Sequence, residues 1–142
     1  MPFATLLALA VAAAPVADPR TPESAASAFV EAFKAMDETR FDRFFAPDVT
    51  MFFPDGPFPK ERVEGRAAVL SAFRGFFRRV KERGRKTLNI TPLDQRVDRY
   101  GNIAVVSFRL DSGNAVGRRS VVMRKVGSEW RIVHFHASTI DK

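Results

Sequence analysis

The chain has 142 residues, of which 46% are hydrophobic, and its 14 phenylalanines exclude a disordered protein and favour one domain with a sizeable core. It contains no cysteine, which excludes disulfide frameworks, zinc fingers and thiol nucleophiles. The formal net charge of +7 raises the question of an anionic partner, which the distribution of the basic residues must answer.

Residues 1–17, MPFATLLALAVAAAPVA, carry no charge and are nearly all apolar. About 12 apolar residues are too few to span a bilayer but suit the apolar core of a signal peptide. We therefore expect an export signal over 1–17, a folded domain over 18–142, and a periplasmic or secreted protein. No Lys or Arg precedes the apolar run, so a cytoplasmic location is the alternative.

The sequence predicts mainly helices between residues 21 and 83. Thr21 and Pro22 are typical of a helix start, and apolar residues at three- and four-residue steps continue this helix to Met36. A short second helix is predicted within 37–48. The clearest predicted helix covers 66–83, and its apolar stripe consists of Val69, Phe73, Phe76, Phe77 and Val80.

The apolar period changes to that of strands in the second half of the chain. A short strand is predicted over 49–53, and turn residues separate four further strands, predicted over 86–93, 102–110, 118–126 and 129–138. Helices followed by hairpin-connected strands predict an α+β domain. We expect a curved antiparallel sheet that wraps three N-terminal helices.

The last predicted strand, EWRIVHFHAST, holds both histidines of the chain. Strand alternation places Trp130, Ile132, His134 and His136 on one face. Three interpretations of the two histidines are open: a metal site, for which a third ligand is missing from the motif, acid/base chemistry in a pocket, or hydrogen bonding at the edge of the core. The last is favoured, and we expect neither a metal ion nor a cofactor.

The order of elements and this closing strand resemble the nuclear-transport-factor-2-like superfamily, over residues 21–140. That group includes ketosteroid isomerase, SnoaL-like polyketide cyclases and the association domain of calcium/calmodulin-dependent kinase II. The association domain ends on W-x-x-V-H-F-H-x-S, matched here from Trp130 to Ser138, and VEG at 63–65 is also similar. The resemblance implies a cone-shaped fold with a deep pocket and an outer sheet face that commonly forms a dimer.

The resemblance also identifies where enzyme residues would stand. The position that matches the base aspartate of ketosteroid isomerase is Phe53, and the only tyrosine, Tyr100, falls in a predicted turn. Both chemical groups of that mechanism are therefore missing. In the association domains, pocket arginines hold a small carboxylate. Arg109 matches one of them, whereas the other falls at Ser120, and the neighbouring Arg119 is expected to face the opposite side.

We expect a pocket that binds a small organic ligand, which the resemblance extends to a carboxylate, in a homodimer or larger homo-oligomer. The expected polar features are Arg109, His134 and His136, and the expected walls are Phe29, Phe33, Met51, Phe53, Phe73, Phe77 and Trp130. The alternatives are an isomerase, cyclase or lyase that uses a His of the pair as acid/base, and a pure oligomerisation module. Nucleic acid is not favoured as a partner, because the phenylalanines near the basic end of the 66–83 helix have core spacing. No stable membrane span is expected.

Overall fold

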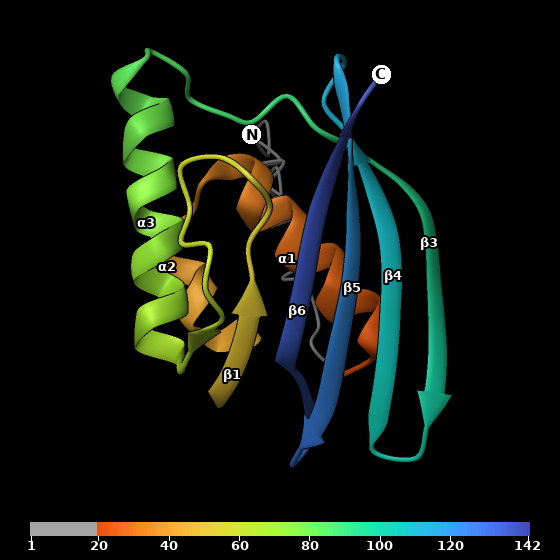
Figure 1. The fold of residues 1–142 in the computed structure, drawn as a ribbon. Helices are drawn as coiled ribbons and strands as arrows, with labels where there is room; N and C mark the ends of the chain where they lie inside the picture. The colour runs from red at the N-terminus through yellow and green to blue at the C-terminus, as the bar shows by residue number, and fades with distance from the viewer. Residues whose placement is uncertain (1–19) are drawn as a thin grey trace, which may run out of the picture.

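The computed structural model describes residues 20–142, so the expected export signal over 1–17 lies outside the described residues. Helices come first and strands dominate the second half, as Figure 1 shows. The elements are α1 (Pro22–Ala35), α2 (Glu38–Phe41), the 3-10 turn η1 (Asp42–Phe44), β1 (Phe45–Phe52), β2 (Val63–Glu64), α3 (Arg66–Glu82), β3 (Thr91–Tyr100), β4 (Ile103–Asp111), β5 (Ala115–Val126) and β6 (Glu129–Asp141).

The two long helices begin and end where the sequence predicts. The Thr21 hydroxyl accepts a hydrogen bond from the backbone N–H of Ser24 at 3.1 Å, which caps α1. Helix α3 ends before Gly84, whose φ of +81° lies in the left-handed region that glycine adopts without strain. Both helices turn their apolar stripe toward the sheet, with Phe29 on α1 and Phe73 on α3 buried.

The α+β class and the curved sheet are confirmed, but the expectation of a purely antiparallel sheet is wrong. The strand order is β2-β1-β6-β5-β4-β3, and β1 pairs with β6 in parallel. Hairpins force the strands from β3 to β6 to alternate in direction. Strand β1 is separated from β6 by α3 and four strands, so no hairpin fixes its direction. The result is an open, mixed sheet (Figure 1).

Several strand boundaries differ from the expected ones, and β5 begins three residues earlier and β6 ends three residues later than predicted. Strand β1 begins at Phe45 and contains Pro47, which was expected to end the second helix. The β1–β6 register shifts between Phe45 and Thr50, so Pro47 lies where the ladder is interrupted and no N–H is required. Strand β3 covers Thr91–Tyr100 rather than 86–93, and the two-residue strand β2 was not predicted.

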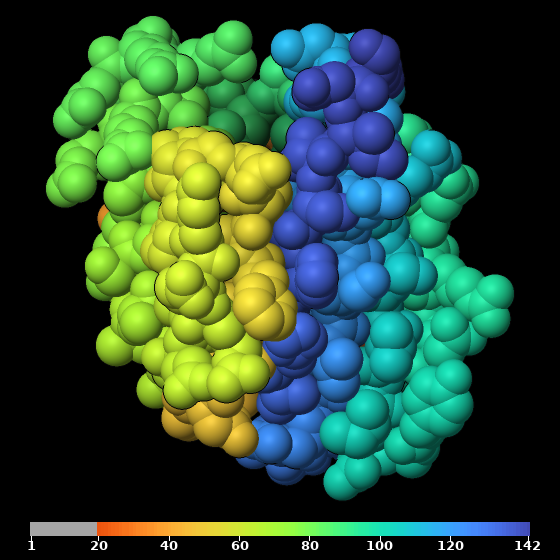
Figure 2. Space-filling model, in the orientation of Figure 1, coloured from red at the N-terminus to blue at the C-terminus, as the bar shows by residue number. Residues whose placement is uncertain are grey.

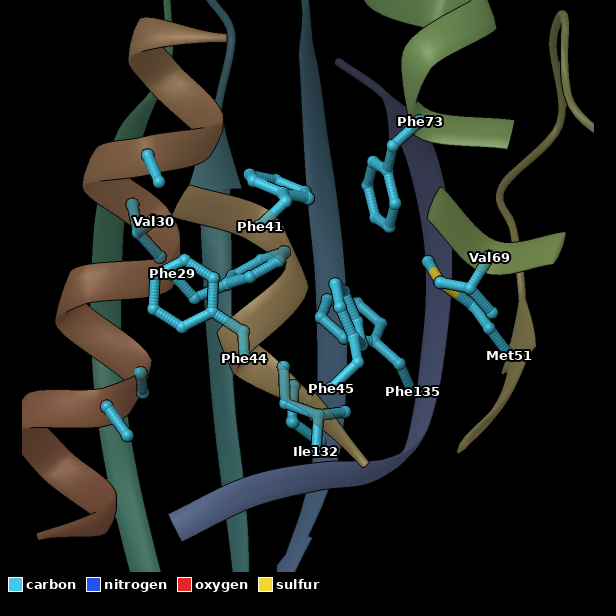
Figure 3. Packing of buried hydrophobic residues seen from close by; sticks show 14 of the residues in the cluster. Phe29, Val30, Phe41, Phe44, Phe45, Met51, Val69, Phe73, Ile132 and Phe135 are labelled. Carbon is cyan, nitrogen blue, oxygen red and sulfur yellow. The ribbon is translucent and has the colours of Figure 1, made fainter. Parts of the chain in front are cut away.

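A cluster of phenylalanines fills the space between the helices and the inner face of the sheet. Figure 3 shows rings from α1, α2, η1, β1, α3 and β6 meeting there. Phe29 is at its centre, with ring centroids of Phe41 and Phe135 both 5.4 Å away. Aromatic pairs at such distances add about 0.5–1.5 kcal/mol each beyond the burial of apolar area. This core holds α1 and α3 against the sheet and so fixes the walls of the site described below.

Within residues 20–142, no helix is both long enough and apolar enough to cross a membrane.

Candidate functional site

A cavity of about 570 Å³ lies between α3, α1, the inner face of the sheet and the loop that follows β1. Its lining reaches the C-terminal end of α3 and the 83–90 connection. It also includes the last residues of β4, the first part of β5 and the last part of β6. In Figure 2 the surface is hollowed at this place, between the end of α3 and the end of β6. The volume is that of a typical small-molecule site.

The inner part of this cavity is apolar and aromatic. The structure places five of the seven expected wall residues there: Phe29, Phe33, Met51, Phe53 and Phe73. Phe77 and Trp130 are not part of the lining. Phe77 is fully buried against Phe41, with ring centroids 5.3 Å apart, and Trp130 lies near the start of β6, where it pairs with Lys125.

Polar residues gather at the other end of the cavity, around its opening. Among the described residues that line the cavity there are three arginines and only one carboxylate, that of Asp55. The uncharged polar residues are Asn89, Ser112, Asn114 and Thr139, and the arginines are Arg83, Arg85 and Arg119. The opening therefore favours an anionic group, while the phenylalanine walls favour an apolar body.

Arg119 is the arginine that the sheet itself brings into the cavity. Strand alternation places it on the inner face of β5 with Val121 and Met123, which are both buried. Its Nη1 atom donates to the backbone carbonyls of Ser138 at 2.9 Å and of Arg118 at 3.0 Å. These two bonds fix one corner of the guanidinium against β5 and β6.

The remaining donors of Arg119 are unused within residues 20–142. No hydrogen bond from its Nε or Nη2 atom and no ion pair of its guanidinium exists in this part of the chain. Burial lowers the pKa of Arg119 to about 10, so the guanidinium is still charged at neutral pH. A half-buried cation without a carboxylate partner is costly, and a bound anion would offset that cost. Its free Nε and Nη2 donors form the fork that receives a carboxylate in two parallel hydrogen bonds.

Arg109, which was expected in the pocket, lies on the other side of the sheet. Ala104, Val106, Phe108 and Leu110 are the buried positions of β4, so the odd-numbered residues of that strand face outward. The Arg109 side chain is exposed and donates to the carboxylate of Asp94 from both Nε and Nη2. The two arginines thus exchange the faces that the sequence analysis assigned to them.

The histidines also face away from the cavity, because β6 contains a β-bulge. Met123 pairs with Ile132 and Val122 pairs with His134, so Val133 is an extra residue that reverses the alternation. Trp130 and Ile132 before the bulge are buried, and so are Phe135 and Ala137 after it. His134 and His136 consequently share the outer face, and neither lines the cavity.

On that outer face His134 is held by β1. Its Nδ1 atom shares a hydrogen bond of 2.7 Å with the Thr50 hydroxyl, and the Phe52 ring lies 6.1 Å from the His134 ring and 5.6 Å from the His136 ring. Burial, then the charges of His136 and Arg62, lower the pKa of His134. No group of three or more His, Cys, Asp or Glu side chains suited to a metal ion occurs among residues 20–142.

The sequence analysis missed the functional potential of Arg119, Arg83 and Arg85. The signal for Arg119 was present, since it shares its strand parity with Val121 and Met123 in an apolar run. The other two arginines stand at or just beyond the basic end of the 66–83 helix, where no ligand role was predicted. Only the fold shows that this end borders a cavity.

Comparisons with known proteins agree with this architecture. Among solved structures, the chain is similar to a proposed calcium/calmodulin-dependent kinase II association domain from Thiobacillus denitrificans (27% identity, 90% of this chain and 100% of that one, TM-score 0.65). It is also similar in fold to a proposed ketosteroid isomerase from Parabacteroides distasonis (23% identity, 84% and 87% covered, TM-score 0.67). A proposed dehydratase from Streptomyces avermitilis of the NTF2-like family has the same fold (19% identity, 82% and 91% covered, TM-score 0.67).

A comparison with curated proteins found no significant match. The model of the SnoaL-like domain matches residues 23–142, which is nearly all of the described chain. The helices, the curved sheet and the cavity between them are the parts that this match covers. The chain therefore belongs to the SnoaL-like domain family, with the NTF2-like fold.

Proposed function

We propose that this protein binds a small organic carboxylate in the cavity, with Arg119 as the residue that receives the carboxylate. The observation that carries the proposal is the half-buried guanidinium of Arg119, which has two backbone carbonyls as partners and no acidic partner within residues 20–142. Leaving a charge unpaired at the wall of an apolar cavity costs stability, and an anionic ligand removes that cost. Ligand binding is the use of the site that this arrangement supports best.

The distribution of polar and apolar residues defines the shape of the ligand. A flat or branched apolar body fits against Phe33, Phe53 and Phe73, whose rings line the inner part of the cavity. The carboxylate remains near the opening, where Arg119 forms two hydrogen bonds with it and Arg83 and Arg85 add positive potential. Aromatic or branched acids of about ten heavy atoms are of suitable size for such a site.

Isothermal titration of the full chain tests the proposal with two matched probes, 3-phenylpropanoate and the neutral 3-phenylpropanamide. A charged hydrogen-bonded pair contributes about 1.5–3 kcal/mol, so the acid should bind about 10–100-fold more tightly than the amide. Arg119→Met should remove this preference, and Arg109→Met on the outer face serves as the matched control that keeps it. Equal affinities for acid and amide in the wild type, or a preference that survives Arg119→Met, would overturn the proposal.

The enzyme alternative receives less support from the geometry. The two histidines considered for acid/base work lie on the outer face, across the sheet from the cavity. Asp55 is the one carboxylate among the described lining residues, and the position of the ketosteroid isomerase base is a phenylalanine, Phe53. A binding role requires neither group.

We also propose that the outer face of the sheet forms a homodimer. Phe52 is 37% exposed there, beside His134 and His136, and Val105 and Val122 continue the row across β4 and β5. Light scattering after size exclusion should give the mass of a dimer for the wild type and of a monomer for Phe52→Glu. Ala68→Glu, which adds the same charge at an exposed position of α3 away from the sheet, should stay dimeric. A monomeric wild type would contradict this proposal.

A further inference from the structure

Gly117 is an unexpected residue inside a long strand, two residues after the start of β5. It lies in β5, where it pairs with Leu110 on β4 and with Thr139 on β6, and both registers run through it without a shift. Its φ is not in the left-handed region, so its backbone does not require glycine. Glycine inside a strand is less favourable than alanine, and it often marks the close approach of another group.

The group that approaches Gly117 is the guanidinium of Arg119. A Cβ atom added to Gly117 would lie 2.8 Å from Nη1 and 3.0 Å from both Cζ and Nη2 of Arg119. Contacts below about 3 Å are repulsive for such atoms, so a side chain at position 117 would push the guanidinium away from the sheet. The guanidinium thus occupies the space in which a Cβ atom of residue 117 would stand, and glycine leaves this space open.

This contact decides how Arg119 is oriented. With Gly117 below it, the guanidinium stays within reach of the Ser138 and Arg118 carbonyls, and Nη1 is occupied by them. The edge formed by Nε and Nη2 is then left without a partner from residues 20–142. An arginine displaced by a Cβ atom would lose the two carbonyls and turn freely in the cavity.

We propose that Gly117 is a positioning residue that holds the guanidinium of Arg119 flat against β5, with its Nε–Nη2 edge free to receive the carboxylate in two hydrogen bonds. The orientation of Arg119 is inferred from its contact with Gly117. That this orientation serves carboxylate binding rests on the proposed function. It identifies the ligand head group as a planar carboxylate that approaches parallel to the sheet. A planar fork held in one orientation selects such a group over a neutral amide, because an amide offers one acceptor and opposes the fork with its own donors.

The test compares Gly117→Ala with Gly75→Ala, which adds a methyl group on α3 where nothing lies within 4 Å. Titrations with 3-phenylpropanoate and 3-phenylpropanamide measure both dissociation constants for each variant. Gly117→Ala should raise the dissociation constant of the acid about tenfold, the value of one weakened charged hydrogen bond, and leave that of the amide unchanged. Gly75→Ala should change neither. In an Arg119→Met background, Gly117→Ala should have no effect on either probe.

A second measurement reads the orientation of Arg119 without any ligand. Nitrogen-15 NMR of the arginine side chains should give separate Nη1 and Nη2 signals for Arg119 in the wild type, because the two carbonyl bonds hinder rotation about the Cζ–Nε bond. The same signals should average in Gly117→Ala and remain separate in Gly75→Ala. Circular dichroism and amide spectra establish that each variant is folded, and Gly117→Ser provides a second substitution if the alanine variant does not fold.

The outcomes separate the two proposals. If the wild type prefers the acid and Gly117→Ala keeps both that preference and the separate Nη signals, the positioning role is wrong and the proposed function stands. If the wild type shows no preference for the acid, the proposed function fails, and the role of Gly117 in carboxylate binding fails with it. Averaged Arg119 signals already in the wild type would overturn the positioning role whatever the titrations give.

Discussion

The two faces of the sheet treat their arginines in opposite ways. On the outer face Arg109 is paired with Asp94 and Arg124 with Asp48, and the second pair lowers the pKa of Asp48 through its hydrogen bond with Arg124. On the inner face Arg119 has only backbone carbonyls as partners within residues 20–142, although it is the most buried of the three.

This difference shows where the charge of the protein is neutralised by its own side chains and where it is not. Exposed pairs contribute little to stability, because water already solvates both ions. A half-buried arginine loses that solvation and regains it only from a partner. The inner face, where an unpaired charge lowers the stability of the protein, is thus the face on which a ligand is expected.

The largest expected difference between the faces concerns packing. Phe135→Ala removes a ring that is 2% exposed and meets Phe29 in the core, so the free energy of unfolding should fall by about 3–5 kcal/mol. Phe52→Ala, on the outer face, should cost less than about 1 kcal/mol when it is measured at a protein concentration low enough for the monomer to prevail. Urea denaturation monitored by Trp130 fluorescence measures both. Similar losses for the two variants at that concentration would mean that Phe52 contributes as much as a core residue within the monomer, which would contradict the difference between the faces.

The unpaired arginine should lower the stability of the protein without ligand. Arg119→Met keeps most of the side-chain volume and removes the charge, so the free energy of unfolding should rise by about 1 kcal/mol. Arg109→Met removes an exposed pair and should change it by less than about 0.5 kcal/mol. Thermal denaturation at pH 7 tests the sign for each variant. A destabilised Arg119→Met would show that the bonds to Ser138 and Arg118 outweigh the burial of the charge.

The arginines at the cavity opening should act on the rate of association. Neutralising both, as Arg83→Gln with Arg85→Gln, should slow binding of 3-phenylpropanoate about two- to fivefold at low ionic strength, because the potential that attracts an anion is weaker. Arg118→Gln on the outer face is the matched control. Stopped-flow measurements at two salt concentrations should show the difference shrinking as salt is added. An effect that does not depend on salt would indicate direct contact with the ligand instead.

The smallest expected effect is a pH dependence from the outer face. The folded protein lowers the pKa of His134 below its usual value of 6.5, so the unfolded chain binds the proton more readily. Stability should therefore fall as the pH decreases from about 6.5 toward the lower pKa of the folded state. His134→Gln, which keeps a partner for the Thr50 hydroxyl, should reduce the difference in unfolding free energy between pH 7.5 and pH 5. An unchanged difference would assign the pH dependence to other groups.

The sequence was sufficient for the fold class and for most of the cavity walls. Capping by Thr21 and the spacing of Phe73 and Val69 are local signals, and they predicted α1 and α3 to within a residue or two. The inner phenylalanines follow from the same periodicity, because a residue on the apolar stripe of a helix must face the sheet. The direction of β1 relative to β6 had no such local signal, since it depends on how distant segments meet.

The sequence analysis placed His134, His136 and Arg109 on the wrong face of the sheet. One extra residue, Val133, reverses the faces of everything after it in β6, and nothing in the local sequence marks the bulge. Arg109 was placed inward by a family resemblance that the alternation of Phe108 and Leu110 contradicts. Gly117 was part of a predicted turn, and its contact with Arg119 exists only once β5 is extended.

The central position of β6 has a consequence for how the chain folds. This strand is made of residues 129–141, later in the chain than every other described element, yet it lies between β1 and β5. Its pairing with β1 joins residues as far apart in the chain as Phe45 and Ile132. The entropy lost in closing so long a loop must be overcome before such contacts contribute stability. Until β6 arrives, β1 and β5 each present an open edge that can pair with another chain. Folding during synthesis should thus remain incomplete until the last strand has left the ribosome, and the interval before that is when this protein is most exposed to aggregation.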